Sequence, residues 1–154
     1  MHYWEAQKSY TIKKNDSGLR LDKFMSKAAP KLPQALMYKY IRKKRIKING
    51  KRAEISTRLS EGDIIEAYIS DELLEETETK YDFLSAPKNI VIVYEDSNIL
   101  LVDKKQGVLV HPDQNEYVDT LISRIKHYLY DKGEYKPDQE NSFKPALANR
   151  IDRN

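Results

Sequence analysis

The sequence of 154 residues predicts an α+β protein built from two small units. Helix-like and strand-like periodicities alternate along the chain, which indicates mixed secondary structure. An acidic stretch without sustained periodicity separates two periodic regions. We therefore expect a first unit over residues 10–69, an acidic linker over 70–89 and a second unit over 90–154.

Two helices are expected near the start of the first unit. Asp16 or Ser17 can cap the first helix. Pro30 and Pro33 end it, and Pro33 can serve as the first residue of the second helix. The apolar residues of both helices recur at helical spacing: Leu21, Phe24, Met25 and Ala28 in the first, and Leu36, Met37, Tyr40 and Ile41 in the second.

Short strands follow these helices. Ile46 and Ile48 alternate with a lysine, and Asn49-Gly50 comes next. This dipeptide is a strong hairpin signal, because both residue types tolerate a positive φ. A Gly62-Asp63 turn then precedes a strand that should turn Ile65, Ala67 and Ile69 to one face.

The second unit begins with apolar strands and is expected to be incomplete. "IVIVY" and "ILLVD" flank an Asp-Ser-Asn turn, and "GVLVHP" predicts a third strand. Asp119 is the expected N-cap of a helix with an apolar face. Continuously apolar strands need cover on both faces, and open strand edges pair with other chains. Either a partner covers these strands, through self-association for example, or the chain is a fragment.

Composition restricts the classes of protein that fit. The chain has no cysteine, which excludes disulfides and cysteine-ligated metal sites and fits the reducing cytoplasm. Its longest apolar runs have the length of strands, so we expect no membrane partner. The histidines, His2, His111 and His127, lack metal-ligand spacing, and His111-Pro112 favours a structural role for His111.

The charge is distributed unevenly, although the net charge is only +3. Residues 39–52 contain eight basic and no acidic residues: Lys39, Arg42, Lys43, Lys44, Arg45, Lys47, Lys51 and Arg52. Residues 61–82 contain nine acidic residues against one lysine. A solvated helix face is one reading of such a run. The lack of compensating acids favours a surface that binds the phosphate backbone of a nucleic acid.

The first unit resembles the αL-motif RNA-binding domain named after ribosomal protein S-four. The resemblance rests on "GLRLDKFM", "ALMYKYIRKKRIKINGKR" and "LSEGDII" in this order. In that family the two helices and the hairpin strand contact RNA. The resemblance therefore implies RNA-binding roles for Lys39, Arg42, Lys43, Arg45, Lys47 and Lys51. Arg20 and Asp22 have an alternative role as a structural pair at the start of the first helix.

The second unit contains a series of motif positions in a fixed order: Tyr94-Glu95-Asp96, Lys104, Gly107, His111-Pro112, Thr120-Leu121, Arg150 and Asp152. In this series it resembles the catalytic domain of the RluA-type pseudouridine synthases. Lys105 replaces a usual proline, and Asn149 and Ile151 replace a usual histidine and leucine. The resemblance implies a small αL-type domain followed by a mixed α/β catalytic domain. Since no counterpart of that domain's later part follows Asp152, we expect a truncated domain and an inactive chain.

The implied activity is an RNA-modifying isomerase that converts uridine to pseudouridine in ribosomal or transfer RNA. By resemblance, Asp152 is the catalytic carboxylate and Arg150 occupies the space that the displaced base leaves. The reaction has no redox step, so no cofactor and no metal are expected. The alternative is a non-catalytic RNA-binding module. DNA or an anionic membrane is a weaker reading, since the basic run lacks a long helix with aromatic anchors.

Overall fold

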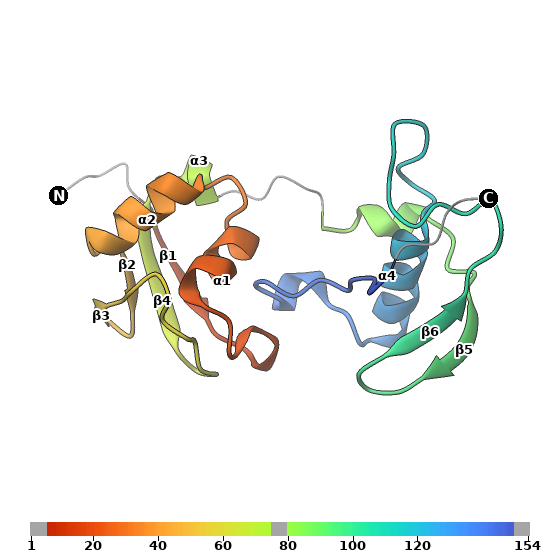
Figure 1. Cartoon of the computed structure of the whole chain (residues 1–154), viewed down its shortest axis with the longest axis horizontal. Helices are drawn as coiled ribbons and strands as arrows, with labels where there is room; N and C mark the ends of the chain where they lie inside the picture. The colour runs from red at the N-terminus through yellow and green to blue at the C-terminus, as the bar shows by residue number, and fades with distance from the viewer. Residues whose placement is uncertain (1–5, 75–79, 150–154) are drawn as a thin grey trace. The chain divides into compact units, whose positions relative to one another are not determined.

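A computed structural model describes residues 6–74 and 80–149 and divides the chain into two compact units (Figure 1). The first unit combines Met1–Glu78 with Asp138–Phe143, and the second combines Thr79–Pro137 with Lys144–Asn154. Among the described residues, every helix is too short or too polar to cross a bilayer.

The first unit contains a four-stranded antiparallel sheet in the order β1-β4-β2-β3. Its strands are β1 (Ala6–Thr11), β2 (Ile46–Ile48), β3 (Lys51–Arg52) and β4 (Ile64–Ile69). The central strand β4 pairs with β1 along its whole length and with β2 on its other side. The register places Ile46 opposite Ala67, so apolar residues of both strands face one side.

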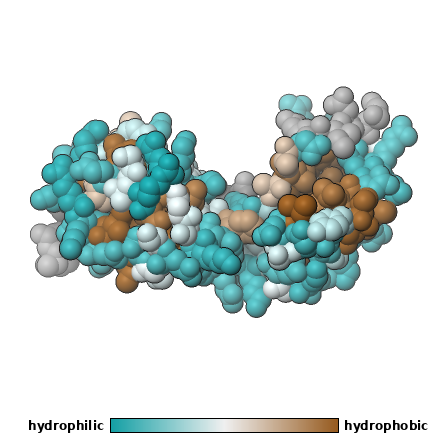
Figure 2. Space-filling model, turned by 60° about the horizontal axis from the view of Figure 1, so that its bottom comes forward, coloured by the Kyte–Doolittle hydropathy of each residue, from teal (hydrophilic) through white to brown (hydrophobic). Residues whose placement is uncertain are grey.

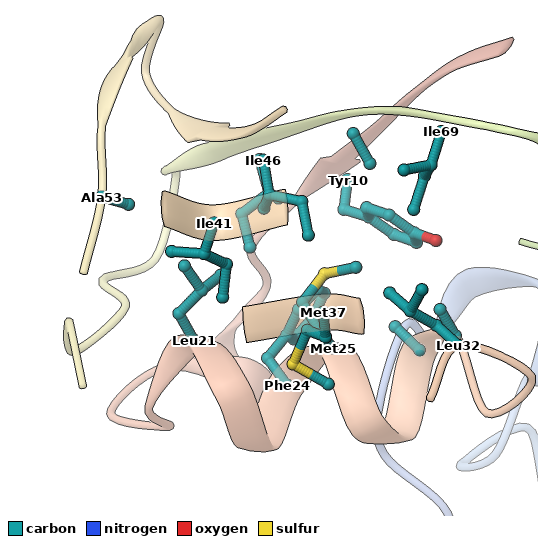
Figure 3. Packing of buried hydrophobic residues seen from close by; sticks show 14 of the residues in the cluster. Tyr10, Leu21, Phe24, Met25, Leu32, Met37, Ile41, Ile46, Ala53 and Ile69 are labelled. Atoms are coloured by element: carbon teal, nitrogen blue, oxygen red, sulfur yellow. The ribbon is translucent and has the colours of Figure 1, made fainter. Parts of the chain in front are cut away.

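Two helices cover that side of the sheet and enclose the core (Figure 3). They are α1 (Leu21–Ala28) and α2 (Gln34–Arg42), and the short α3 (Asp71–Leu74) follows β4. The fully buried large side chains include Leu21, Phe24, Met25, Met37, Ile41, Ile46, Ile65 and Ile69. The helical spacing and the alternation expected from the sequence are thus confirmed for this unit.

The expected cap of α1 was wrong, because Asp16 has another function in the fold. The N-cap of α1 is Arg20, whereas Asp16 lies in the 3-10 turn η1 (Lys14–Asp16) and is fully buried. Its carboxyl group accepts hydrogen bonds from the backbone N–H of Lys13 (3.0 Å), from Asn141 Nδ2 (3.0 Å) and from Ser142 Oγ. Asp16 therefore holds the distant segment Asp138–Phe143 in the first unit.

The second unit contains a hairpin and one long helix. The hairpin consists of β5 (Val91–Glu95) and β6 (Leu100–Asp103), as expected, with an irregular register between Ile92 and Tyr94. The helix α4 (Leu121–Lys132) follows, and the 3-10 turns are η2 (Asp82–Ser85) and η3 (Pro137–Gln139). The side chain of Glu95 accepts hydrogen bonds from Tyr128 Oη (2.7 Å) and Lys132 Nζ, which fix the end of β5 to α4.

Two expectations for this unit were wrong. The segment "GVLVHP" forms no strand, and Leu109 makes only an isolated bridge with Thr120. The N-cap of α4 is Thr120, whose hydroxyl accepts from the backbone N–H of Ser123 (3.3 Å). Asp119 instead binds the Arg124 guanidinium, which keeps the pKa of that carboxyl low. Arg124 donates to both carboxylate oxygens of Asp119 in a bidentate ion pair, and such pairs are among the strong hydrogen-bonded interactions of proteins.

The β5–β6 hairpin exposes much of its apolar surface. The side chains of Val93 and Leu101 are 69% and 51% exposed, and those of Val91, Tyr94 and Ile99 are also exposed. Figure 2 shows hydrophobic surface on the second unit. Apolar strands exposed in this way are typical of surfaces that other polypeptide segments cover.

Candidate nucleic-acid interface

The basic residues lie on one continuous segment that joins α2 to the β2–β3 hairpin. Lys39 and Arg42 belong to the last turn of α2, where cations interact favourably with the helix dipole. Lys44 then adopts a left-handed φ of 62°, and the backbone N–H of Arg45 donates to Tyr40 O (2.8 Å). This turn ends the helix and leads directly into β2.

All six residues proposed to contact RNA are described, and none is buried. Lys39, Arg42, Lys43 and Lys51 are exposed, whereas Arg45 and Lys47 are half-buried. Ile46 and Ile48, the neighbours of Lys47 in β2, turn toward the core side, so Lys47 projects from the opposite face of the sheet. The structure thus brings these cations together along one segment, while their contact with RNA stays a prediction.

Two tyrosines contact cations of this segment, and neither was assigned a role in RNA binding from the sequence. Tyr40 was expected only on the apolar face of the second helix. The Arg45 guanidinium lies over the Tyr40 ring, 5.7 Å from its centroid, and the Lys47 ammonium lies over the Tyr68 ring at the same distance. Tyr68 follows the basic segment by many residues, and strand pairing brings it back. The sequence signal for the position of Tyr68 was the alternation of β4. Because Ile65, Ala67 and Ile69 face the core, Tyr68 faces away from it.

Hydrogen bonds join the Asn49-Gly50 turn of the basic hairpin to the Gly62-Asp63 turn. Asn49 and Gly50 have φ values of 52° and 74°, which confirms the expected hairpin. Asn49 donates from Nδ2 to Asp63 Oδ1 (3.0 Å) and accepts at Oδ1 from the backbone N–H of Ile64 (2.9 Å). The backbone N–H of Ser60 donates to Asp63 Oδ2 (2.8 Å). These two hydrogen bonds, from Ser60 first and then from Asn49, lower the pKa of Asp63.

Arg20 and Asp22 form an ion pair at the start of α1. Arg20 Nε and Nη2 lie 3.2 and 3.3 Å from the two carboxylate oxygens of Asp22, which is buried. Asp22 also accepts from the backbone N–H of Lys23 (2.9 Å) in the first turn of the helix. The pair therefore stabilises the helix start, as the structural alternative for these two residues predicts.

In the second unit, several described residues of the synthase-like motif lie in turns or at the N-cap of α4. Asp96 accepts from the backbone N–H groups of Asn98 (2.7 Å) and Ile99 (2.9 Å) and from Tyr94 Oη (2.8 Å). These bonds, those of the two N–H groups first, lower its pKa. Gly107 has a φ of 88°, and Thr120 caps α4. Arg150 and Asp152, the proposed base-displacing and catalytic residues, lie outside the described residues.

Comparison with known proteins relates both units to one class of protein. The model of the S4 domain matches residues 19–65. An uncharacterized RNA pseudouridine synthase of Mycoplasma capricolum is 36% identical over 145 residues, which are 94% of this chain and 46% of that protein. One of Mycoplasma genitalium is 30% identical over 149 residues, again 94% of this chain.

A relative with a more specific name is similar over a shorter stretch. The ribosomal large subunit pseudouridine synthase D of Buchnera aphidicola is 31% identical over 112 residues, which are 71% of this chain and 33% of that protein. The chain spans 46%, 45% and 33% of the lengths of these three relatives, respectively.

Replacing Asp63 by alanine should destabilise the first unit in a pH-dependent way. The variant leaves the Asn49 amide and the Ser60 N–H without their acceptor, which costs about 1–2 kcal/mol near neutral pH. The folded-state pKa of Asp63 lies below its ordinary value of 3.8. Its stabilising contribution is therefore complete above that value and is lost as the pH falls through the lowered pKa.

Urea unfolding of the wild type and the Asp63→Ala variant, at about pH 7 and about pH 3, measures this effect. The difference in unfolding free energy should shrink at the lower pH. Glu61→Ala, at an exposed carboxylate in the same turn, is the matched control and should be nearly neutral. An equal difference for Asp63→Ala at both pH values would contradict the role of the ionised carboxylate.

Proposed function

We propose that this chain belongs to the RluA-type family of RNA pseudouridine synthases and that the protein isomerises uridine to pseudouridine in ribosomal or transfer RNA. One observation carries the proposal. The similarity to proteins with this name covers 94% of the chain, so it includes the second unit and is not confined to the S4 domain. A shared RNA-binding module alone would give similarity over residues 19–65 only.

The isomerisation is chemically simple enough for side chains alone. The bond between ribose C1′ and uracil N1 breaks, the base rotates, and a bond forms between C1′ and C5. C5 loses a proton and N1 gains one, so atoms and electrons balance without an oxidant or reductant. A single carboxylate can assist, either by attacking the ribose or by removing a ribose proton.

In this proposal Asp152 is that carboxylate, and Arg150 fills the space of the displaced base. Flipping a base out of its stack costs a few kcal/mol, and an inserted side chain offsets part of that cost. Support for both roles comes from their positions in the sequence motif, since the structure does not describe these residues. The fold contributes the ordered Asp96 turn and the capped start of α4 within the same motif.

The first unit supplies RNA affinity in this proposal through the basic segment of residues 39–52. Its cations are spread along a helix end, a turn and a hairpin and would contact successive phosphates. An RNA substrate and the absence of cysteines agree with a cytoplasmic location.

We also propose that the 154-residue chain associates with itself through the β5–β6 hairpin. The exposed apolar side chains of Val93 and Leu101 lie on a sheet that has two strands within residues 80–149, and among those residues its outer strand edges are available for pairing. A second copy of the same hairpin offers matching apolar surface and matching edges.

Replacing Asp152 by asparagine in the full-length protein, including any sequence that follows residue 154, should abolish pseudouridine formation and leave RNA binding unchanged. Release of tritium from RNA labelled at uridine C5 measures turnover, and filter binding measures affinity. Turnover should fall at least about a hundredfold, because the reacting carboxylate is lost. Asp82→Asn, at an exposed aspartate in η2, is the matched control. Equal turnover of the Asp152→Asn variant and the wild type would refute the catalytic role, and equal inactivity would support a pure RNA-binding module.

RNA binding should weaken steeply with salt. If about four of the basic residues contact phosphates, the plot of log affinity against log salt concentration should have a slope of about −3 for single-stranded RNA. Replacing Arg42 and Lys43 by glutamine should make that slope less steep by about 1.4, because two phosphate contacts are lost. Lys136→Gln, at an exposed lysine of the second unit, should leave it unchanged. A wild-type slope near zero would exclude phosphate contacts as the source of affinity.

Self-association should disappear when the apolar surface of the hairpin is charged. Sedimentation equilibrium of the wild-type chain should show a mass that rises with concentration, and the Val93→Lys/Leu101→Lys variant should remain monomeric. Lys136→Gln is a suitable control, because Lys136 is an exposed lysine of the second unit outside the hairpin. A monomeric wild type at every concentration would contradict this proposal.

A further inference from the structure

The outer face of the four-stranded sheet carries side chains unlike those of its core face. Ile65, Ala67 and Ile69 of β4 are buried, so Glu66 and Tyr68 project from the opposite face. Lys47 of β2 lies directly opposite Glu66 in the register and projects from the same face. This face therefore places an aromatic ring, a carboxylate and a cation next to one another.

Hydrogen bonds orient the Tyr68 ring. Its hydroxyl donates to Glu66 Oε2 (2.5 Å), and Gln7 Nε2 lies within hydrogen-bond distance of the same oxygen (3.2 Å) and of Tyr68 Oη (3.3 Å). The Lys47 ammonium lies over the ring, 5.7 Å from its centroid. A half-buried ring that is held at its hydroxyl presents a fixed apolar surface.

A second cation–aromatic pair lies beside the first. The backbone N–H of Tyr68 donates to Arg45 O (2.8 Å), so Arg45 and Tyr68 are direct neighbours across the strands. The Arg45 guanidinium in turn lies over the ring of Tyr40. The backbone hydrogen bond between Tyr68 and Arg45 thus links two ring–cation pairs, Tyr40–Arg45 and Tyr68–Lys47, and these four residues form a band of two rings and two cations.

We propose that this band, Tyr68 above all, binds unpaired RNA nucleotides by stacking their bases. The inference rests on the proposed RNA-binding function of the first unit and specifies the form of RNA it recognises. Single-strand binding surfaces combine cations for the backbone with aromatic rings for the bases, and this band supplies both at neighbouring positions. Paired bases are stacked within a helix, so such a ring selects unpaired segments.

The position of Glu66 favours binding of a base, rather than a phosphate, next to Tyr68. Its carboxylate repels phosphate, but it can accept a hydrogen bond from the amino group of a base. Lys47 is a flexible side chain, and a base that stacks on Tyr68 displaces its ammonium toward the adjacent phosphate. A stacked base and a bound phosphate then occupy neighbouring positions on the outer face.

The test measures binding of the 154-residue chain to a single-stranded oligonucleotide and to an RNA duplex of equal length. Tyr68→Leu should weaken single-strand binding about 5- to 100-fold. The slope of log affinity against log salt concentration should equal that of the wild type, because stacking on an uncharged ring releases no counterions. Lys47→Gln should instead change the slope. Tyr68→Phe should bind within about threefold of the wild type, because it retains the ring.

Tyr117→Leu is the matched control for the loss of a tyrosine. Tyr117 is an exposed residue of the second unit, outside the β5–β6 hairpin. Circular dichroism checks that each variant remains folded. If Tyr68→Leu binds the single strand like the wild type, or loses single-strand and duplex binding equally, the stacking proposal fails while the RNA-binding function stands. If the wild type binds neither RNA, both proposals fail.

Discussion

The first unit depends on the two-sided pairing of its central strand. β4 is hydrogen-bonded to β1 on one side and to β2 on the other, and this fixes which side chains face the helices. A shift of one residue in either pairing would expose Ile65, Ala67 and Ile69 to solvent and bury Glu66 and Tyr68. The same register positions the basic hairpin next to Tyr68. The strand pairing that builds the core therefore also arranges the proposed RNA-binding surface.

Residues with one dominant local preference were predictable from the sequence. Asn49-Gly50 formed its turn because few residue types tolerate the required φ, and the apolar spacing of α1 and α2 identified the core. Features that depend on distant partners were not predictable. The strand β1 was missed because its sequence has little apolar alternation, and it forms through pairing with β4. Asp16 resembled a helix cap, but Asn141 and Ser142, far away in the chain, determine its role.

The two units differ in how completely they bury their apolar residues. The first encloses a continuous core between the sheet and its helices, whereas the β5–β6 hairpin leaves Val93 and Leu101 largely exposed. The described residues of the synthase motif form turns and caps in the second unit, and the residues proposed to react with RNA lie outside the described part. The order and spacing of both motif sets indicated the family, and the comparisons found an S4 domain and relatives named RNA pseudouridine synthases.

A titration of the isotopically labelled chain with unpaired RNA, followed by amide chemical shifts, tests the central claim most directly. That claim is that the first unit binds RNA through the basic segment and the adjoining outer face of the sheet. The largest shift changes should fall within residues 39–52 and at Glu66 and Tyr68, with little change in β5 and β6. Shift changes concentrated in the β5–β6 hairpin, or no changes at all, would contradict it.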